Sequence, residues 1–477
     1  MIPIAQLTIK DAHKHLLDKD FSAEDLAKAY LLEISKVNKD FNAYLEVYDD
    51  VLKQAKIVQK DIDAGKFSPL SGIPISIKDN ILIEGKRAGA ASKILENYIA
   101  PYDATVIKKL KSEGAVFLGR TNMDEFAMGG STENSAYGVT KNPIDQSRVS
   151  GGSSGGSVAT VAANLAIASL GSDTGGSVRE PSAFCGVVGL KPTYGSVSRY
   201  GLMAMGSSLD CVGPITKTVT DSEIMFKAIK GRDPLDSTTF PETTYPKIKN
   251  SKSKNLIIGV PYHILEQGIS KDVKNNFDSG IKHLKDLGYE IKDIKLENIS
   301  YSLAVYYIIM PAEVSSNLAR YDGVKYGLHV DGGDNLLADY LKTRRIGFGR
   351  EARRRIIIGT YVLSSGYYDS YYNKALMLRQ KIGDDFTRAF SEVDIIATPT
   401  APGPAFKIGE KISDPLSLYL EDVFTVPANI VGIPAISIPS GTVSIDGKNL
   451  PLGLQLMAPH ACEELLFTVG KKFLVEE

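Results

Sequence analysis

Net charge, cysteine and long apolar runs are all scarce in this sequence of 477 residues. The 55 lysines and arginines nearly balance 56 aspartates and glutamates, which gives a net charge of −1. No overall field therefore favours binding to nucleic acid, to a membrane surface or to acidic substrates. The three cysteines, Cys185, Cys211 and Cys462, have no metal-ligand spacing and form no disulfide framework. We interpret them as apolar buried thiols and assign no role to Cys211.

Membrane-targeting and membrane-spanning segments are also missing from the sequence. Residues 1–17 lack the basic region and apolar run of a secretory signal, and no long uncharged segment could cross a bilayer. Together with the cysteine pattern, these observations predict a cytoplasmic protein with no membrane partner.

The apolar pattern predicts an α/β protein. Hydrophobic residues make up 43% of the chain, enough for a substantial core. Polar caps at Thr8 and Ser22 predict two amphipathic helices at the start. Short apolar runs at 75–77 and 116–118 are typical of buried strands that alternate with helices.

The later part of the chain follows the same pattern. A polar, proline-containing segment at 232–254 is predicted as a surface excursion. After it, a strand near 255–260, a helix near 273–287 and a second strand form a plausible strand-helix-strand unit. Strand-like runs recur near residues 394, 433 and 452, followed by a final helix from Glu463. We therefore expect one large sheet rather than separate domains.

Two glycine- and serine-rich patches are the most unusual feature: GGSSGGS at 151–157 and GSDTGGS at 171–177. They enclose an apolar stretch that reads as a helix from about Ser157 and a strand ending near Leu170. A flexible linker has no such apolar anchoring. Neither patch continues as GxxxxGKS/T or has the GxGxxG order after a strand, which disfavours a nucleotide-phosphate site.

Each patch offers a candidate serine nucleophile. Residues 151–155 match the GxSxG elbow of hydrolases, but no apolar strand precedes them and residues 16–262 contain no histidine for a relay. Ser177 instead follows a predicted strand, where the backbone N–H groups of Gly175, Gly176 and Ser177 can converge on an oxyanion. The alternative for this second patch is a plain glycine turn.

Lys78 is the candidate base. In PISIKDN, Ile75 and Ile77 share one face of a strand, while Ser76 and Lys78 share the other. A lysine acts as a base near neutral pH only if burial lowers its pKa from about 10.4. The alternative is a solvated charge at a strand end. Ser153 could relay a proton between Lys78 and Ser177.

Taken together, Lys78, GGSSGGS at 151–157 and DTGGSVREPSAFCG at 173–186 resemble the amidase signature family, and similar segments cover nearly the whole chain. The resemblance implies one α/β/α domain over residues 1–477 around a large mixed sheet, with a catalytic core at about 65–220 and a substrate-side part at about 255–477. It also implies a Ser-cisSer-Lys triad. Its residues would be Ser177 as nucleophile, Ser153 with a cis peptide as bridge, Lys78 as base, the backbone of Thr174, Gly175, Gly176 and Ser177 as oxyanion hole, and Arg179 as the residue that orders the loop.

Within the family, the segments beginning at Arg120 and Pro311 resemble the ammonia-releasing chains of tRNA-dependent amidotransferases. The resemblance implies that glutamine is the donor and that a tRNA-binding partner, the B component, converts Glu-tRNA(Gln) or Asp-tRNA(Asn) to the amide form. It further implies a small third chain, the C component, in a heterotrimer. ATP and Mg²⁺ would bind the tRNA-binding partner, with no cofactor or metal on this chain. A stand-alone amidase acting on small amides is the alternative, and a non-catalytic scaffold is a third possibility.

Free glutamine carries an α-carboxylate and an α-ammonium group, so its site needs a cation and an anion. By resemblance these are Arg355 and Asp422, with Tyr306 or its neighbour Tyr307 lining the pocket. Arg355 belongs to a cluster of six arginines within 344–355, most of which we expect to face solvent or a partner. Asp422 has an alternative interpretation as a helix cap.

Overall fold

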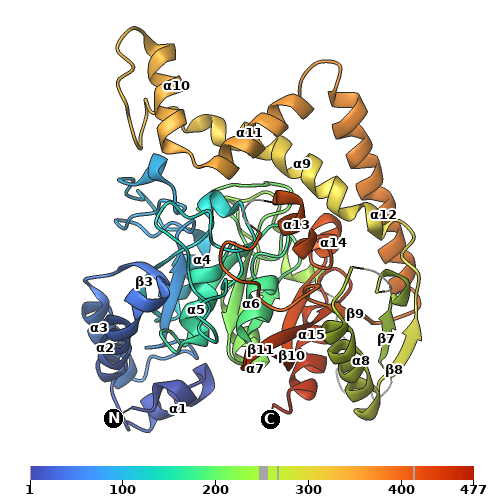
Figure 1. The fold of residues 1–477 in the computed structure, drawn as a ribbon. Helices are drawn as coiled ribbons and strands as arrows, with labels where there is room; N and C mark the ends of the chain where they lie inside the picture. The colour runs from blue at the N-terminus through green and yellow to red at the C-terminus, as the bar shows by residue number, and fades with distance from the viewer. Residues whose placement is uncertain (1, 246–255, 266–267, 412–413, 477) are drawn as a thin grey trace.

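The computed structural model describes residues 2–245, 256–265, 268–411 and 414–476 (Figure 1). These residues form an 11-stranded sheet in the order β1-β3-β2-β4-β6-β5-β10-β11-β9-β7-β8. The strands are β1 (Tyr44–Val47), β2 (Pro74–Lys78), β3 (Val116–Thr121), β4 (Ala168–Asp173), β5 (Val188–Lys191), β6 (Cys211–Thr216), β7 (Ile257–Val260), β8 (Glu290–Asp293), β9 (Ile395–Pro399), β10 (Ala435–Ile445) and β11 (Lys448–Met457).

The sheet is mixed, as predicted. Strand β2 runs parallel to both β3 and β4, and β7 runs parallel to both β8 and β9, whereas the other neighbours are antiparallel. The helices are α1 (Ile9–Leu17), α2 (Ala23–Phe41), α3 (Val51–Asp63), α4 (Thr105–Ser112), α5 (Gly155–Ala162), α6 (Arg179–Cys185), α7 (Val219–Ile229), α8 (Lys271–Asp286), α9 (Ser302–Asn317), α10 (Leu336–Gly347), α11 (Arg350–Val362), α12 (Lys374–Phe390), α13 (Pro415–Tyr419), α14 (Val426–Val431) and α15 (Glu463–Phe473).

Several of these helices and strands were predicted from short sequence patterns. Thr8 caps α1, and Ser22 forms a capping box with Asp25 at the start of α2. The predicted strand-helix-strand unit is β7-α8-β8, in which the two strands are parallel neighbours. Residues 246–254 of the predicted surface excursion lie outside the described residues.

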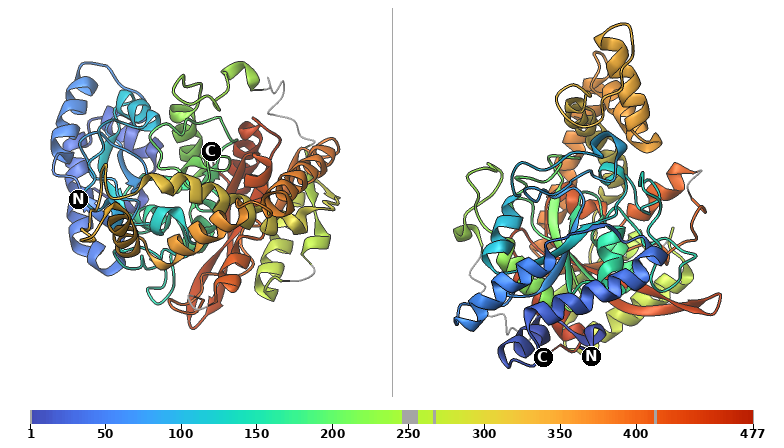
Figure 2. Two further views of the ribbon diagram at one scale, coloured as in Figure 1. Left: turned by 90° about the horizontal axis from the view of Figure 1, so that it is seen from above. Right: turned by 90° about the vertical axis from the view of Figure 1, so that its left-hand side faces the viewer.

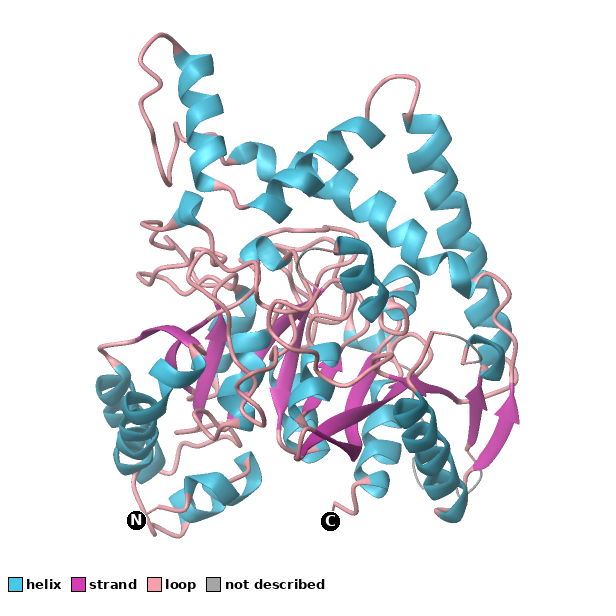
Figure 3. Ribbon diagram, in the orientation of Figure 1, coloured by secondary structure: helices cyan, strands magenta, loops and turns pink. Residues whose placement is uncertain are grey.

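Helices cover both faces of the sheet (Figures 2 and 3). Successive residues of a strand point to opposite faces, and β11 shows the two layers. Gly453 faces Ala183 of α6, whereas the next residue, Leu454, faces Gly280 of α8. Ser76 of β2 bonds to Thr160 of α5 through their hydroxyls, which are 2.8 Å apart. The predicted α/β/α fold is therefore confirmed.

A separate group of helices, α9 to α12, lies across the top of the molecule in Figure 1. Helices α9 and α11 pack closely, because a β-carbon at Gly359 would lie only 1.8 Å from the carbonyl oxygen of Pro311. Only glycine fits at that contact. Tyr306 of α9 also packs on Gly175, just past the carboxyl end of β4, which places the pair at the end of the sheet where the candidate catalytic residues lie.

Within the described ranges, no helix is both long and apolar enough to cross a membrane. The same ranges contain no group of three or more His, Cys, Asp or Glu side chains placed to hold a metal ion. The three cysteines are free thiols. Cys185 and Cys211 are buried as predicted, whereas Cys462 is only half-buried.

Candidate active site

Lys78 is the last residue of β2, and its side chain is 0% exposed. Its Nζ lies 2.8 Å from Ser153 Oγ, 2.8 Å from Ser154 Oγ and 2.9 Å from Ser172 Oγ. Burial lowers the pKa of Lys78 to about 7, although Asp124, Asp173 and Asp210 act to raise it. The interpretation of Lys78 as a solvated charge is therefore wrong, and a large neutral fraction is available at physiological pH.

Ser153 precedes α5, and the peptide bond between Gly152 and Ser153 is cis. The side chain is fully buried, and its hydroxyl contacts the Lys78 amine. Hydrogen bonds hold the backbone on both sides of this serine. The Gly152 N–H donates to Glu180 Oε2 at 3.1 Å, and the Ser153 carbonyl accepts from the Asp124 N–H at 3.2 Å. The hydroxyl that would bridge base and nucleophile is thus fixed against the base.

Ser177 lies in the turn between β4 and α6, as the sequence predicted. It is 8% exposed, whereas Lys78 and Ser153 are 0% exposed, so the candidate nucleophile is the most accessible of the three. Its carbonyl accepts a hydrogen bond from the Ser154 N–H at 3.1 Å, which ties the two glycine-serine patches together. The Ser177 hydroxyl bonds to no other described residue, so its link to Ser153 stays a prediction.

Asp173 shapes this turn. Its carboxylate accepts the N–H groups of Gly176 at 3.0 Å and Val178 at 3.2 Å, and both oxygens accept from the Arg179 guanidinium. Burial raises the pKa of Asp173, but Arg179 outweighs it and holds the pKa at about 2. The predicted oxyanion hole included Gly176, but the Gly176 N–H is already used by Asp173, so the backbone N–H groups of Thr174, Gly175 and Ser177 stay as its candidate donors.

Arg179 is fully buried and orders the turn, in keeping with the role predicted for it. Besides Asp173, its guanidinium donates to the Thr425 carbonyl at 2.8 Å, to Asn429 Oδ1 at 2.6 Å and to Gln455 Oε1 at 2.6 Å. These partners lie far along the chain, just before α14, on α14 and on β11. Arg179 therefore joins the nucleophile turn to the C-terminal part of the sheet.

Both candidate tyrosines contact the site from α9. The Tyr306 ring packs on the nucleophile turn, because a β-carbon at Gly175 would lie 2.7 Å from Tyr306 Cζ. The Tyr307 hydroxyl donates to Asp422 Oδ2 at 3.1 Å. Tyr306 is thus next to the reacting atoms and Tyr307 is next to the candidate ammonium-binding carboxylate.

Asp422 ends a 3-10 turn, Leu420–Asp422, and its side chain caps no described helix. Burial raises its pKa to about 7, although the hydrogen bond from Tyr307 and the charge of Arg355 lower it. The helix-cap interpretation is therefore wrong, and Asp422 is a half-buried carboxyl group whose charge is poorly compensated.

Arg355 on α11 is only 3% exposed. Its Nε donates to Glu351 Oε1 at 2.8 Å, and its guanidinium lies 5.5 Å from the ring centres of both Tyr307 and Tyr419. No described residue accepts a hydrogen bond from Nη2, which leaves that nitrogen available for a carboxylate. Of the same cluster, Arg345, Arg350 and Arg353 are exposed, and Arg344 and Arg354 are half-buried.

Sequence reasoning missed several neighbours of these residues. Ser154 and Ser172 share Lys78 with Ser153, and Glu351 binds both Arg355 and the Tyr419 hydroxyl, the latter at 2.8 Å. Ser172 is the neighbour whose position follows from strand alternation once the pairing of β2 with β4 is known. With β2 and β4 parallel and Ile77 opposite Leu170, the strand alternation brings Ser172 to the end of β2.

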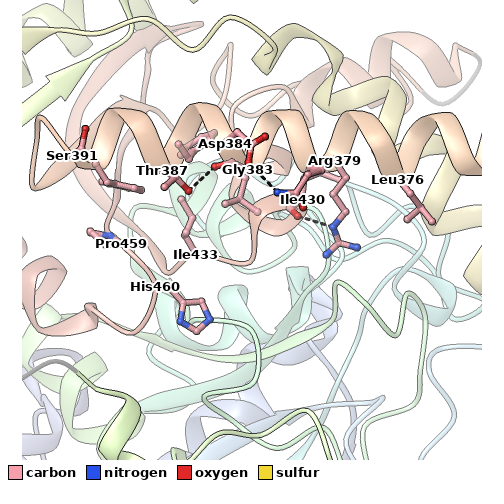
Figure 4. A pocket seen from close by; sticks show the side chains of 14 residues that line it. Leu376, Arg379, Gly383, Asp384, Thr387, Ser391, Ile430, Ile433, Pro459 and His460 are labelled. Carbon is pink, nitrogen blue, oxygen red and sulfur yellow. Dashed lines mark hydrogen bonds between the residues drawn. The ribbon is translucent and has the colours of Figure 1, made fainter.

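Two cavities bear on the question of where a substrate binds. One, of about 150 Å³, is lined by Ser131, Leu418, Tyr419 and Glu351 among others, and so lies beside the Arg355 group. A larger cavity of about 620 Å³ lies between α12 and α14 (Figure 4), where Arg379 donates to the Ile430 carbonyl at 2.9 Å. None of the predicted site residues lines either cavity, but Glu351 and Tyr419, which line the smaller one, both contact Arg355, so we place the amino-acid end of the substrate near the smaller cavity.

Comparison with known proteins finds a matching family and relatives that agree with one another. The model of the Amidase family matches residues 25–467. The chain is 50% identical over 470 residues to the A subunit of glutamyl-tRNA(Gln) amidotransferase from Caldanaerobacter subterraneus subsp. tengcongensis, covering 98% of this chain and 96% of that protein. It is also 50% identical over 472 residues to the protein of the same name from Desulfatibacillum aliphaticivorans, with the same coverage of 98% and 96%.

Solved structures agree with these relatives. The crystal structure of the glutamyl-tRNA(Gln) amidotransferase A subunit from Thermotoga maritima is similar with a TM-score of 0.81 and 42% identity, covering 99% of this chain and 95% of that one. The native peptide amidase from Stenotrophomonas maltophilia is similar with a TM-score of 0.81 and 27% identity, covering 99% and 97%.

Proposed function

Because this chain belongs to the amidase family, we propose that it is the glutamine-hydrolysing subunit of a tRNA-dependent amidotransferase. One observation carries the amidase chemistry: a fully buried lysine, with a pKa near 7, hydrogen-bonded to the serine beside a second, more accessible serine. A structural scaffold has no need for a buried lysine without a carboxylate partner, since burying that charge costs free energy.

The proposed reaction begins with proton transfer. Neutral Lys78 takes a proton from Ser153, which takes one from Ser177 as the Ser177 oxygen attacks the carboxamide carbon of glutamine. The N–H groups of Thr174, Gly175 and Ser177 stabilise the oxyanion. The relay then returns the proton to the departing nitrogen, which leaves as ammonia, and water hydrolyses the acyl-enzyme to glutamate.

The substrate site follows from the charges. Arg355 Nη2 faces the α-carboxylate of glutamine, and Asp422, oriented by Tyr307, accepts the α-ammonium group. Tyr306 packs between this region and the nucleophile turn. The two ends of the amino acid are thus held apart from the carboxamide, which is placed at Ser177.

The wider assembly is the part of the proposal that rests on similarity to the amidotransferase relatives. A tRNA-binding partner chain takes the ammonia and converts Glu-tRNA(Gln), or Asp-tRNA(Asn), to the amide form in the cytoplasm. A small third chain completes the heterotrimer. ATP and Mg²⁺ bind the tRNA-binding partner, and tRNA is contacted mainly through it.

Capture of the tagged chain from its own cells tests this proposal. We expect a tRNA-binding partner and a small third chain to co-purify, and ammonia release from glutamine to rise when ATP and mischarged tRNA are added. The control is the same capture with an unrelated tagged protein. If the chain comes alone and hydrolyses simple amides better than glutamine, it is instead the stand-alone amidase.

That alternative is favoured by one finding, the similarity to a peptide amidase over 99% of this chain. Arg355→Met separates the two functions. In a glutamine enzyme it removes the partner of the α-carboxylate, and we expect KM for glutamine to rise about 100-fold with little change in hydrolysis of a neutral amide. Arg353→Met, an exposed arginine on the same helix, is the matched control. Equal KM values in the two variants would favour the stand-alone amidase.

A further inference from the structure

Glu180 is a buried acid that the mechanism above does not use. It lies in the first turn of α6, three residues after Ser177, and is 0% exposed. Its Oε2 accepts the Gly152 N–H at 3.1 Å, whereas its Oε1 has no hydrogen-bond partner among the described residues. Leaving a buried polar atom unpaired costs free energy, so a partner that arrives later is a natural explanation.

The unpaired oxygen lies near one wall of the cavity beside the Arg355 group. Gly130 lies over it, since a β-carbon at Gly130 would be 3.9 Å from Glu180 Oε1 and equally 3.9 Å from Leu418 Cδ1. Leu418 lines the 150 Å³ cavity together with Tyr419 and Glu351. Oε1 and Leu418 thus lie on either side of the space that a side chain at position 130 would fill, and Leu418 is part of the cavity wall.

The charged groups closest to Glu180 are acids. Burial raises the pKa of Glu180 well above its usual range, and the acids Asp422, Glu421 and Asp124 around it raise it further. Glu421 already pairs with Lys411, and Asp124 receives the N–H groups of Thr132 and Asn134.

Asp422 and Glu180 have less compensation, since the side chain of each accepts a single hydrogen bond, from the Tyr307 hydroxyl and from the Gly152 N–H. The nearby cation, Arg355, is bonded to Glu351 instead. Within the described ranges, no lysine or arginine forms an ion pair with either of the two carboxyl groups. Two neighbouring acids of this kind are suited to a ligand that brings its own positive charge.

We propose that Glu180 is a second carboxyl group for the substrate's α-ammonium, accepting one N–H at Oε1 while Asp422 accepts another. An ammonium group has three N–H donors, so one carboxylate leaves at least one donor unmatched in a buried site. The proposal rests on the proposed function, and it narrows the substrate class. The enzyme selects amides with a free α-ammonium group and rejects those in which this nitrogen is acylated.

Binding then has a measurable consequence. An arriving cation favours the ionised form of both carboxyl groups, so protons that they hold in the free enzyme leave to solvent. Glutamine binding should therefore release protons below about pH 7, the pKa of Asp422. The apparent affinity for glutamine should fall as the pH is lowered, beyond the effect of the catalytic lysine.

Glu180→Gln tests the proposal, because the amide oxygen of glutamine can still accept the Gly152 N–H while its NH₂ group opposes an ammonium. We expect KM for glutamine to rise about 10- to 100-fold with kcat within about threefold of the parent. Hydrolysis of 4-carbamoylbutanoate, which is glutamine without its α-amino group, should be unchanged. Proton release on glutamine binding, measured by calorimetry in two buffers with Ser177→Ala present, should fall.

Asp221→Asn is the matched control. Asp221 is also buried, accepts the Ile9 N–H at 3.0 Å through Oδ2 and has an unpaired Oδ1, but it lies at the start of α7 away from the site. An unchanged KM for glutamine in Glu180→Gln, or an equal loss for 4-carbamoylbutanoate, would overturn the role of Glu180. A parent enzyme that releases ammonia from simple amides but not from glutamine would instead contradict the proposed function.

If Glu180→Gln does not fold, Asp422→Asn provides a second test of the proposal. With Asp422 neutral and Lys78→Met added to remove the other titrating group of the mechanism, a proton still released when glutamine binds at pH 6 is the one that the proposal assigns to Glu180. No proton release from this variant at saturating glutamine would overturn it.

Discussion

Ser177→Ala should lower ammonia release from glutamine by about 10⁴-fold or more, because no other hydroxyl is placed to form the acyl-enzyme. Ser177 is the accessible serine of the site, at 8% exposure, and it follows β4 directly. Ser153 is fully buried against Lys78 and cannot reach a substrate without displacing that contact. Initial rates of ammonia formation at saturating glutamine give the comparison.

Mass spectrometry makes the same assignment directly. A reactive glutamine analogue should leave its adduct on Ser177 in the parent and none in the variant. Ser157→Ala is the control from the same glycine-serine region, since Ser157 bonds to Thr121 and lies outside the catalytic machinery. An adduct on Ser153 would reverse the roles of the two serines.

Lys78→Ala should cost nearly as much, about 10³- to 10⁴-fold in kcat, since both serines would then keep their protons. Lys78→Arg should be equally inactive, because an arginine stays charged in proteins. Full activity of Lys78→Arg would contradict the neutral-base mechanism. Both variants are assayed for ammonia release and checked for folding by circular dichroism.

Lys78 also determines how the rate of glutamine hydrolysis depends on pH. The pKa of Lys78 is about 7, and only the neutral amine accepts a proton. Below pH 7 the neutral fraction falls about tenfold per pH unit, so kcat at saturating glutamine should fall by the same factor and should level off above pH 7. Lys217→Met is the control, because Lys217 also has a lowered pKa, about 8, but bonds only to carbonyls near the N-terminus. Its profile should match that of the parent.

Short-range sequence patterns were sufficient to predict the positions of the catalytic residues Lys78 and Ser177. Alternation in PISIKDN put Lys78 at the end of a buried strand, and the strand before DTGGS put Ser177 in a tight turn. Both predictions depend on residues within one strand and its turn. Which atoms meet Lys78 depended on the pairing of β2 with β4, and the sequence alone did not specify that pairing.

The substrate-binding residues could not be predicted from such short-range patterns. Helix α9 is apolar on several sides and contains Pro311, so it lacks the one-sided periodicity that marks a surface helix. The group formed by Arg355, Glu351 and Tyr419 joins α11 to α13 across 68 residues. Contacts over such distances leave no local pattern, and here only the family resemblance pointed to Arg355 and Asp422.

The strand order has a consequence for how such enzymes diversify. Strands β1 to β6 form one side of the sheet and β7 to β11 the other, and the two sides meet where β5 pairs with β10. Lys78, Ser153 and Ser177 all belong to the first side, whereas Tyr306, Arg355 and Asp422 belong to the second. In the proposed mechanism the reacting side chains thus lie on one side and most of the substrate-binding side chains on the other, with Glu180 as the exception on the first side. Substitutions on the second side can therefore change most of the contacts to the amide without touching the triad, and Arg179, which bonds to Asp173 on the first side and to Gln455 on the second, joins the two sides.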